Sequence, residues 1–313
     1  MAKNKDCSFR TSIGGQALIE GILMRGPKKQ AIVCRTADGL VEKVEELKFI
    51  KDRYPVLGWP LIRGCATFLD SMVKGMQALT YSAELVPVEE QEPDKLDQWI
   101  EKHFPAEKAS KIVIGTAVVL GIALALFLFI FLPTLIVGFI KPLTQNLVVR
   151  NLSEGVVKII ILLCYMRLCC CVSDVKRLFS YHGAEHKTIF CYEHGKPLTV
   201  ENVRTESRFH PRCGTSFLLV VVVVSILVNS VVTLTNSFAR MGCHLLLLPV
   251  VVGISYEINR WCGRHDNWLS AALSAPGKWL QRLTTNEPDD SMIECAIRAM
   301  ELVIPEEKGS DAW

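Results

Sequence analysis

The sequence predicts a mainly α-helical integral membrane protein with about four transmembrane helices and a small α+β cytoplasmic region that contains a β-hairpin. Three observations support this fold class. Hydrophobic residues make up 50% of the 313 residues and charged residues only 21%, whereas about 25% are charged in a typical soluble protein. The apolar residues are concentrated in long uncharged runs. Two short alternating segments, separated by Asp38-Gly39, predict the hairpin.

The uncharged runs define the candidate spans. Residues 112–140 carry no charge and exceed the ~20 residues that cross a bilayer core, with a kink expected near Pro133. A second run covers residues 213–239. Two weaker candidates are residues 157–172, which include Lys158 and Arg167, and residues 243–256, which include Pro249. Each of these two is either a short span or a buried helix.

The charges predict the orientation. The first 15 residues do not resemble a signal peptide, so we expect the N-terminal part to stay in the cytoplasm. If all four segments cross, residues 173–212 lie on the same side and carry many Lys and Arg residues, whereas the opposite side keeps Lys141, Arg150, Glu154 and Arg240. The positive-inside rule then predicts a multi-pass protein of the cell membrane with both termini cytoplasmic. A net charge of +3 is too small to indicate nucleic acid as a main partner, so the expected partner is the lipid bilayer.

The soluble parts divide by composition. Residues 14–27 read as a Gly-framed loop, residues 31–36 and 40–49 as the hairpin, and residues 58–84 as an amphipathic helix that lies on the membrane or packs on the hairpin. A final helix follows the acidic residues 287–290. We expect an N-terminal cytoplasmic region (1–87), an acidic connector (88–111), a membrane domain (112–260) that includes a His-rich cytoplasmic loop (173–216), and C-terminal cytoplasmic helices (261–313).

The twelve cysteines are scattered and include no Cys-x-x-Cys pair, which argues against a zinc ribbon or a thioredoxin motif. In a reducing cytoplasm most of them act as small apolar residues.

The sequence from His182 to His186 carries the clearest chemical signal. Four of the seven histidines, at positions 182, 186, 194 and 210, fall in one stretch, and its centre has the pattern H-x-x-E-H. On a helix, His182 and His186 share a face and can bind one divalent metal, with zinc the first choice. Glu185 borders that face and can act as the base toward metal-activated water. Gly183 weakens this helix.

A catalytic zinc site needs a third protein ligand. Glu257 is the first choice, His210 or Cys213 a close second, and Glu193 lies near in sequence. A simpler interpretation than a catalytic metal site is that the histidines solvate a loop at the membrane interface, with Glu185 paired to Lys187 or Arg208. A structural metal that holds the loop in place is an intermediate case.

Basic residues near this motif suggest an anionic substrate. Arg204, Arg208 and Arg212 are spaced by four on a short helix that begins near Thr199. They either lie in the headgroup layer or hold a phosphate or carboxylate near the metal. Glu20 and Arg25 form an ordinary ion pair or contribute to the same site.

Five segments resemble a known bacterial family. The segments GGQALIEGILMRGP, YHGAEHKTIFCYEHGKPLTVENVR, HPRCGTSFL, GISYE and LTTNEPDDSMIECAI, spread from residue 12 to about residue 305, are similar to the signature blocks of the YqhQ family, domain of unknown function 1385. The resemblance implies a metal-dependent membrane enzyme. By position it indicates His182, Glu185, His186, His210, Cys213 and Glu257, together with the loop of Gly14, Gly15, Glu20 and Arg25.

We therefore expect a metal-dependent hydrolase at the cytoplasmic membrane face, with His182, His186 and Glu257 as ligands and Glu185 as base. Peptide, ester and phosphoester bonds all remain open as substrates. The alternative is a non-catalytic membrane scaffold or transport-associated protein, whose histidines bind a structural metal or none.

Overall fold

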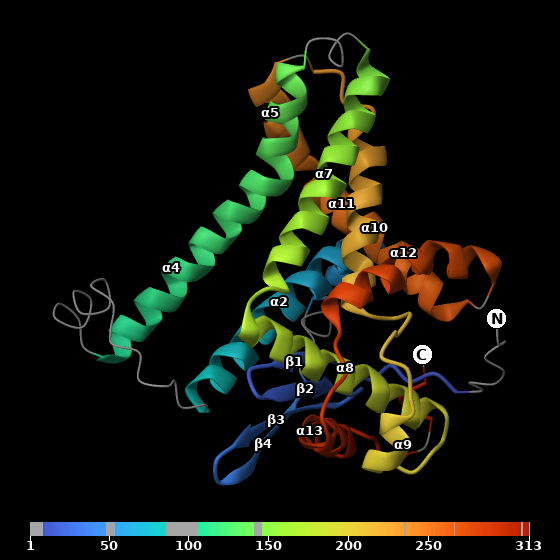
Figure 1. The fold of residues 1–313 in the computed structure, drawn as a ribbon. Helices are drawn as coiled ribbons and strands as arrows, with labels where there is room; N and C mark the ends of the chain where they lie inside the picture. The colour runs from blue at the N-terminus through green and yellow to red at the C-terminus, as the bar shows by residue number, and fades with distance from the viewer. Residues whose placement is uncertain are drawn as a thin grey trace. The chain divides into compact units, whose positions relative to one another are not determined.

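The structure is a computed structural model, and it describes residues 9–47, 54–85, 106–140, 146–234, 236–265, 267–307 and 309–312. The chain divides into two compact units. Unit 1 comprises Met1–Val86, Cys164–Ser225 and Pro249–Trp313, and unit 2 comprises Pro87–Leu163 and Ile226–Leu248. We describe each unit separately (Figure 1).

Unit 1 contains a four-stranded antiparallel sheet of order β1-β2-β3-β4. Its strands are β1 (Gly14–Leu18), β2 (Gly21–Arg25), β3 (Lys29–Thr36) and β4 (Gly39–Glu46). Strands β3 and β4 form the predicted hairpin, with Thr36 paired to Gly39 across the turn. Gly39 has φ +125, a backbone conformation that favours glycine.

The prediction of a loop over residues 14–27 was wrong, because most of this segment forms β1 and β2. Ile22, Leu23 and Met24 are all buried, since helices cover both faces of the sheet. A strand buried on both faces lacks the polar alternation by which strands are recognised in a sequence.

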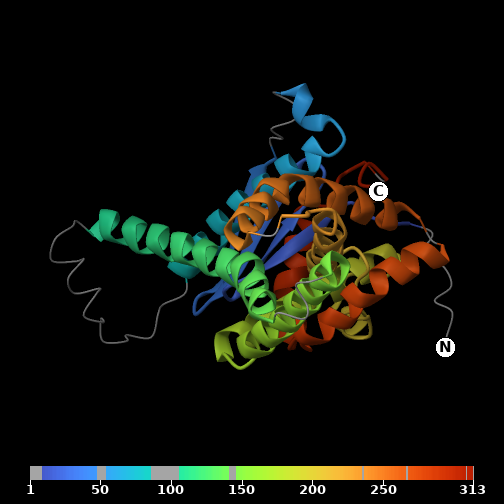
Figure 2. The same ribbon diagram turned by 90° about the horizontal axis from the view of Figure 1, so that it is seen from above.

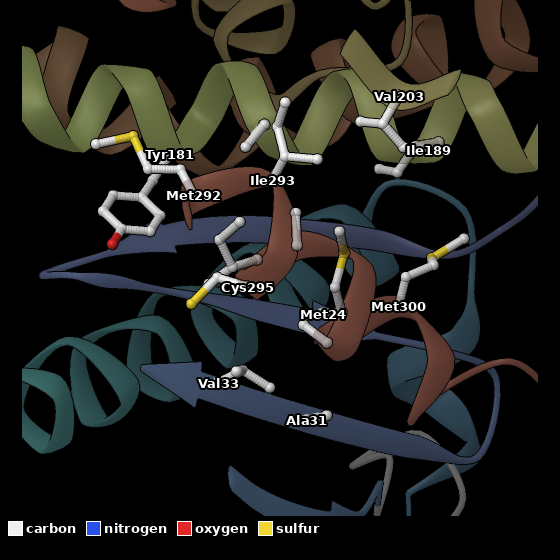
Figure 3. Packing of buried hydrophobic residues seen from close by; sticks show 14 of the residues in the cluster. Met24, Ala31, Val33, Tyr181, Ile189, Val203, Met292, Ile293, Cys295 and Met300 are labelled. Atoms are coloured by element: carbon white, nitrogen blue, oxygen red, sulfur yellow. The ribbon is translucent and has the colours of Figure 1, made fainter. Parts of the chain in front are cut away.

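Three layers make up the core of unit 1 (Figure 2). Helix α2 (Ile62–Leu85) packs on one face of the sheet, where Leu18, Leu23, Ile32 and Cys34 meet Ala78. Helices α8 (Ser173–Glu193) and α13 (Asp290–Glu301) cover the other face. Figure 3 shows that face, where Met24, Ala31 and Val33 of the sheet face Ile293 and Met300 of α13.

Helix α2 forms where an amphipathic helix was expected, yet small residues face its neighbours: Gly64, Gly75, Ala78 and Ser82 are buried. The larger residues Phe68, Met72 and Met76 are exposed. A Cβ atom at Gly64 would lie 2.8 Å from the Tyr256 side chain, so the close approach of the helices requires glycine there.

The other elements of unit 1 are short or C-terminal. The predicted final helix is α13, and the Asp289 side chain caps it by accepting the Met292 N–H at 2.9 Å. The helix predicted to carry the three arginines is shorter than expected: it is α9 (Val200–Arg204), capped by Thr199, so Arg208 and Arg212 lie beyond its end. The remaining elements are η1 (Pro55–Gly58), α9 (Val200–Arg204), α10 (Gly214–Asn229) and α12 (Trp268–Thr284).

Among the described residues, two helical segments are long and apolar enough to cross a membrane, Gly115–Phe139 and Ser237–Arg264. A bent pair of helices is a third candidate, and together these segments support membrane association. The first is built from α4 (Ala106–Leu126), a π-helical turn η2 (Phe127–Phe131) and α5 (Leu132–Phe139), so an irregularity precedes Pro133. The second is α11. The bent pair is α7 (Leu147–Cys169) and α8, which meet at 100°.

Four spans are therefore not confirmed. The predicted span over residues 213–239 is not one helix, because α10 has only 16 residues and residues 237–239 already belong to α11. The part of the predicted connector at residues 88–105 lies outside the described residues. Arg150, Glu154 and Arg240, which we expected on the far side of the membrane, lie within α7 and α11 and are buried.

In helix α7 of unit 2, the apolar side chains are exposed and the charged side chains are buried, which is the reverse of a surface helix in a soluble protein. Val148, Leu152, Val156 and Ile160 form one exposed stripe. Arg150, Glu154 and Lys158 form a buried stripe on another face. Apolar side chains outside and charged side chains inside suit a helix surrounded by lipid.

Candidate metal centre

Helix α8 carries His182, Glu185 and His186, as the spacing predicted. It packs on β1 within unit 1, so these residues lie against the sheet. Gly183 is required here, because a Cβ atom at this position would overlap the Asn286 carbonyl oxygen. The glycine that seemed to weaken the helix thus allows the segment around Thr284 to lie against it.

Backbone carbonyls orient both imidazole rings. The Thr284 carbonyl oxygen lies 2.8 Å from Nδ1 of His182, and the Arg208 carbonyl oxygen lies 2.6 Å from Nδ1 of His186. A carbonyl oxygen only accepts hydrogen bonds, so each Nδ1 carries a hydrogen and donates it. When the rings are neutral, each Nε2 has a free lone pair, which is the arrangement found in metal-binding histidines.

Cys213 completes a group of three possible metal ligands. Its Sγ lies 3.2 Å from Nε2 of His182, and the ligand atoms of His182, His186 and Cys213 all lie within 4.8 Å of one another. Nε2 of His186 is buried and has no hydrogen-bond partner among the described residues. Two imidazole nitrogens and one thiolate are donors that zinc prefers, and around a tetrahedral ion such atoms lie roughly 3.5 Å apart. The residues present therefore fit a zinc ion.

The electrostatics of the group favour a thiolate. Burial opposes ionisation of Cys213, but the adjacent imidazoles of His182 and His186 outweigh it and hold the pKa of the thiol well below its usual value. Burial alone would lower the pKa of His182, yet the nearby Cys213 thiolate raises it to about 9. Without metal, the two groups form an imidazolium–thiolate pair.

Glu185 lies beside these ligands and is buried. Its Oε1 accepts the Gly15 N–H at 3.0 Å, whereas Oε2 has no hydrogen-bond partner in the described part of the chain. Burial raises the pKa of this carboxyl group, although the neighbouring His182 and His186 oppose the shift. Glu185 therefore retains a free oxygen and is a stronger base than an exposed glutamate.

His210 lies one layer behind the metal ligands. Its ring is 5.6 Å from that of His186, centroid to centroid, and it is not part of the three-ligand group. Burial lowers the pKa of His210 to about 4, so it is neutral at physiological pH. Gln281 fixes its backbone through two hydrogen bonds of 2.8 and 2.7 Å. The buried Glu193 pairs with Arg212, which excludes it as a ligand in this arrangement.

The three ligands line a cavity of about 740 Å³ within unit 1. Glu185, Arg25 and Arg212 line it as well. Arg25 is half-buried, and its Nε and Nη2 atoms have no hydrogen-bond partner among the described residues. Burial lowers the pKa of Arg25, while the negative charge of Asp70 opposes the shift. Arg25 and Arg212 thus line the same cavity as the three candidate metal ligands.

Several predicted residues lie elsewhere. Glu257 accepts hydrogen bonds from both Nε and Nη2 of Arg63 and is outside the three-ligand group, so the first choice for the third ligand is replaced by Cys213. Glu20 pairs with Arg177 rather than with Arg25. On the surface, Arg204 pairs with Asp290, and Arg208 lies 3.8 Å from Glu287.

Sequence reasoning did not predict which backbone groups position the motif side chains, although the resemblance indicated Gly15. The carbonyl groups of Thr284 and Arg208 and the N–H of Gly15 position the three motif side chains. Backbone groups leave no trace in residue type, apart from Gly15 itself, where a Cβ would lie 2.6 Å from the Leu23 carbonyl oxygen.

Comparisons with known proteins agree with the resemblance seen in the sequence. Residues 59–306 match a family model described as a protein of unknown function, DUF1385. The chain is 34% identical over 292 residues to an uncharacterized protein, YqhQ, of Bacillus subtilis (strain 168), covering 91% of this chain and 90% of that protein. No solved structure matches the chain.

Proposed function

Because this chain belongs to the DUF1385 family, whose description names no function, we propose one from the site: a metal-dependent hydrolase that acts on an anionic substrate at the cytoplasmic face of the cell membrane. His182, His186 and Cys213 would hold a divalent ion, with zinc the first choice. Glu185 would act as the base.

One observation carries this proposal. Two histidines donate Nδ1–H to backbone carbonyls and direct Nε2 toward a cysteine thiolate, all within 4.8 Å. Such outer hydrogen bonds fix the tautomer of a ligand before the metal arrives. Three protein ligands that line a cavity also leave a position for substrate, which supports catalysis over a closed structural cage.

The residues around the ligands have separable roles. A bound divalent ion would polarise a carbonyl or phosphoryl oxygen and lower the pKa of water. Glu185 accepts the proton of the attacking water at Oε2 while Gly15 holds its Oε1. The raised pKa of Glu185 suits proton transfer near neutral pH. Arg25 and Arg212 bind a phosphate or carboxylate of the substrate.

The proposed topology is multi-pass, with both termini and the site cytoplasmic. The apolar segments α4–α5, α7, α10 and α11 would be the four spans. The basic loop of residues 173–212 supports a cytoplasmic location for the site.

A thiol-dependent mechanism is the second candidate, favoured by the 3.2 Å separation of Cys213 Sγ and His182 Nε2. The thiolate would form a bond to the substrate carbonyl carbon, the bond from that carbon to the leaving group would break, and the leaving group would take the proton from His182. Water would then cleave the thioester, releasing the acid, and its proton would return to His182. In that case His186→Ala removes any bound metal but leaves Cys213 reactive and hydrolysis intact. A scaffold with a structural metal predicts no hydrolysis at all.

The test uses the full chain purified in mild detergent, loaded with zinc and assayed against ester, phosphoester and peptide substrates. We expect Glu185→Gln to retain metal and lose hydrolysis, and His186→Ala to lose both. His194→Ala is the matched control, because His194 bonds to Glu206 at 2.9 Å and is not among the ligands. Absence of metal in the wild type, or full hydrolysis by Glu185→Gln, would contradict the proposal.

A further inference from the structure

Unit 2 contains a second polar cluster, independent of the proposed function. Arg150, Glu154 and Lys158 lie one turn apart on α7, and Arg240 and His244 lie one turn apart on α11. Each of these five side chains is at most 6% exposed. Charged residues buried inside a helical membrane unit are costly and mark functional sites.

One carboxylate organises part of the cluster. Arg240 Nε lies 2.9 Å and Arg150 Nε lies 3.6 Å from the same Glu154 oxygen. Arg240 also donates to Asn151, and Asn151 donates to the Ser230 carbonyl at 2.7 Å. These contacts join α7, the chain that precedes α11, and α11 itself.

The charges of the cluster do not balance. Two basic side chains, Lys158 and Arg240, lie in a cluster with one buried acid, Glu154, and no other acid is buried among the described residues of unit 2. His244 is 3% exposed, and neither of its ring nitrogens has a hydrogen-bond partner in this part of the chain. The charges that act on His244 are the positive charges of Lys158, Arg240 and Arg150. The cluster therefore has excess positive charge and an unpartnered donor at one place.

The basic residues lie at different distances from the ends of their helices. Arg150 lies three residues into α7 and Arg240 three residues into α11, which is about 5 Å along each helix axis. Lys158 lies about 12 Å farther along α7, and His244 lies about 6 Å farther along α11. Basic pockets between membrane helices bind the headgroups of anionic lipids.

We propose that the interior of unit 2 binds a phosphate group beside Lys158 and His244, either from an anionic lipid headgroup or as free phosphate. The bound anion supplies the missing negative charge, and His244 donates a hydrogen bond to it. This assigns unit 2 a ligand site that is separate from the cavity of unit 1.

Thermal unfolding of the full chain in uncharged detergent tests the proposal. One arm titrates inorganic phosphate at constant ionic strength, and the other adds phosphatidylglycerol to the micelles. We expect at least one probe to raise the wild-type midpoint, because a ligand that binds only the folded state stabilises it. A response to phosphatidylglycerol assigns a headgroup, and a response to phosphate alone assigns the free ion.

Three variants locate the effect. Lys158→Met should be more stable than wild type without either probe, because it removes an uncompensated buried charge, and its apparent affinity for the responding probe should fall at least tenfold. His244→Leu should lose the response as well, and it provides the test if Lys158→Met does not fold. Lys176→Gln, at an exposed position of α8, should respond like the wild type. No response of the wild type, or an undiminished response of His244→Leu, would overturn the proposal.

Discussion

Gly183→Ala tests whether the close contact between α8 and the segment around Thr284 organises the metal ligands. Helix propensity alone predicts that alanine stabilises α8 by about 1 kcal/mol. The structure predicts the opposite sign. The new Cβ would overlap the Asn286 carbonyl oxygen, so the two backbones would have to separate by about 1 Å, which costs about 3 kcal/mol.

The net destabilisation is therefore about 2 kcal/mol, which lowers the unfolding midpoint of a unit of this size by about 4–8 °C. Zinc affinity should fall as well. Thr284, two residues from Asn286, orients His182 through a 2.8 Å hydrogen bond, and loss of such an outer contact weakens metal binding about 10–100-fold.

Thermal unfolding in detergent and a chelator competition assay measure the two effects. Gly242→Ala is the control, because a Cβ atom on this glycine of α11 meets nothing within 4 Å, and it should leave the midpoint unchanged or raise it. If Gly183→Ala is as stable as the wild type and binds zinc equally well, the contact does not organise the site.

Three further predictions concern the residues around the ligands. The pKa of His182 is about 9 in the metal-free site, so zinc must displace a proton from this ring when it binds. The apparent zinc affinity should therefore rise about tenfold per pH unit from neutrality up to that pKa and then level off. A chelator titration that shows no pH dependence would contradict this. Arg212→Met should lower stability by about 3 kcal/mol, because it leaves the buried Glu193 without its cationic partner. Arg25→Met should be neutral or stabilising, because two donors of Arg25 have no partner among the described residues. Thermal unfolding compares the two variants, and equal losses would refute the assignment. Glu257→Gln should leave zinc content unchanged, since Glu257 pairs with Arg63; elemental analysis showing metal loss would restore Glu257 as a ligand.

The proximity of the two histidines was more predictable than the third member of the candidate metal group. Spacing of four residues on a helix brought His182 and His186 together, because helical periodicity is a local property. Cys213 was one of three alternatives, and sequence spacing could not select it. Glu257 finds its partner Arg63 at a separation of 194 residues, and nothing local indicates such a pairing.

Burial explains the errors in the fold. Strands β1 and β2 were hidden because both faces of the sheet are covered, so Ile22, Leu23 and Met24 show no alternation. Helix α11 was underestimated because Arg240 counts against a span in any hydropathy profile. In the structure Arg240 is buried beside Glu154 within unit 2, so its charge does not face the surroundings of the helix.

X-ray absorption spectroscopy of the zinc-loaded wild type tests the central claim most directly. We expect one sulfur ligand at about 2.3 Å and nitrogen ligands at about 2.0 Å from the metal, with the imidazole scattering of His182 and His186. In Cys213→Ser the sulfur shell should disappear, whereas Cys191→Ser, which changes a buried cysteine outside the group, should retain it. A wild-type protein that binds no zinc, or binds it without sulfur, would contradict the claim.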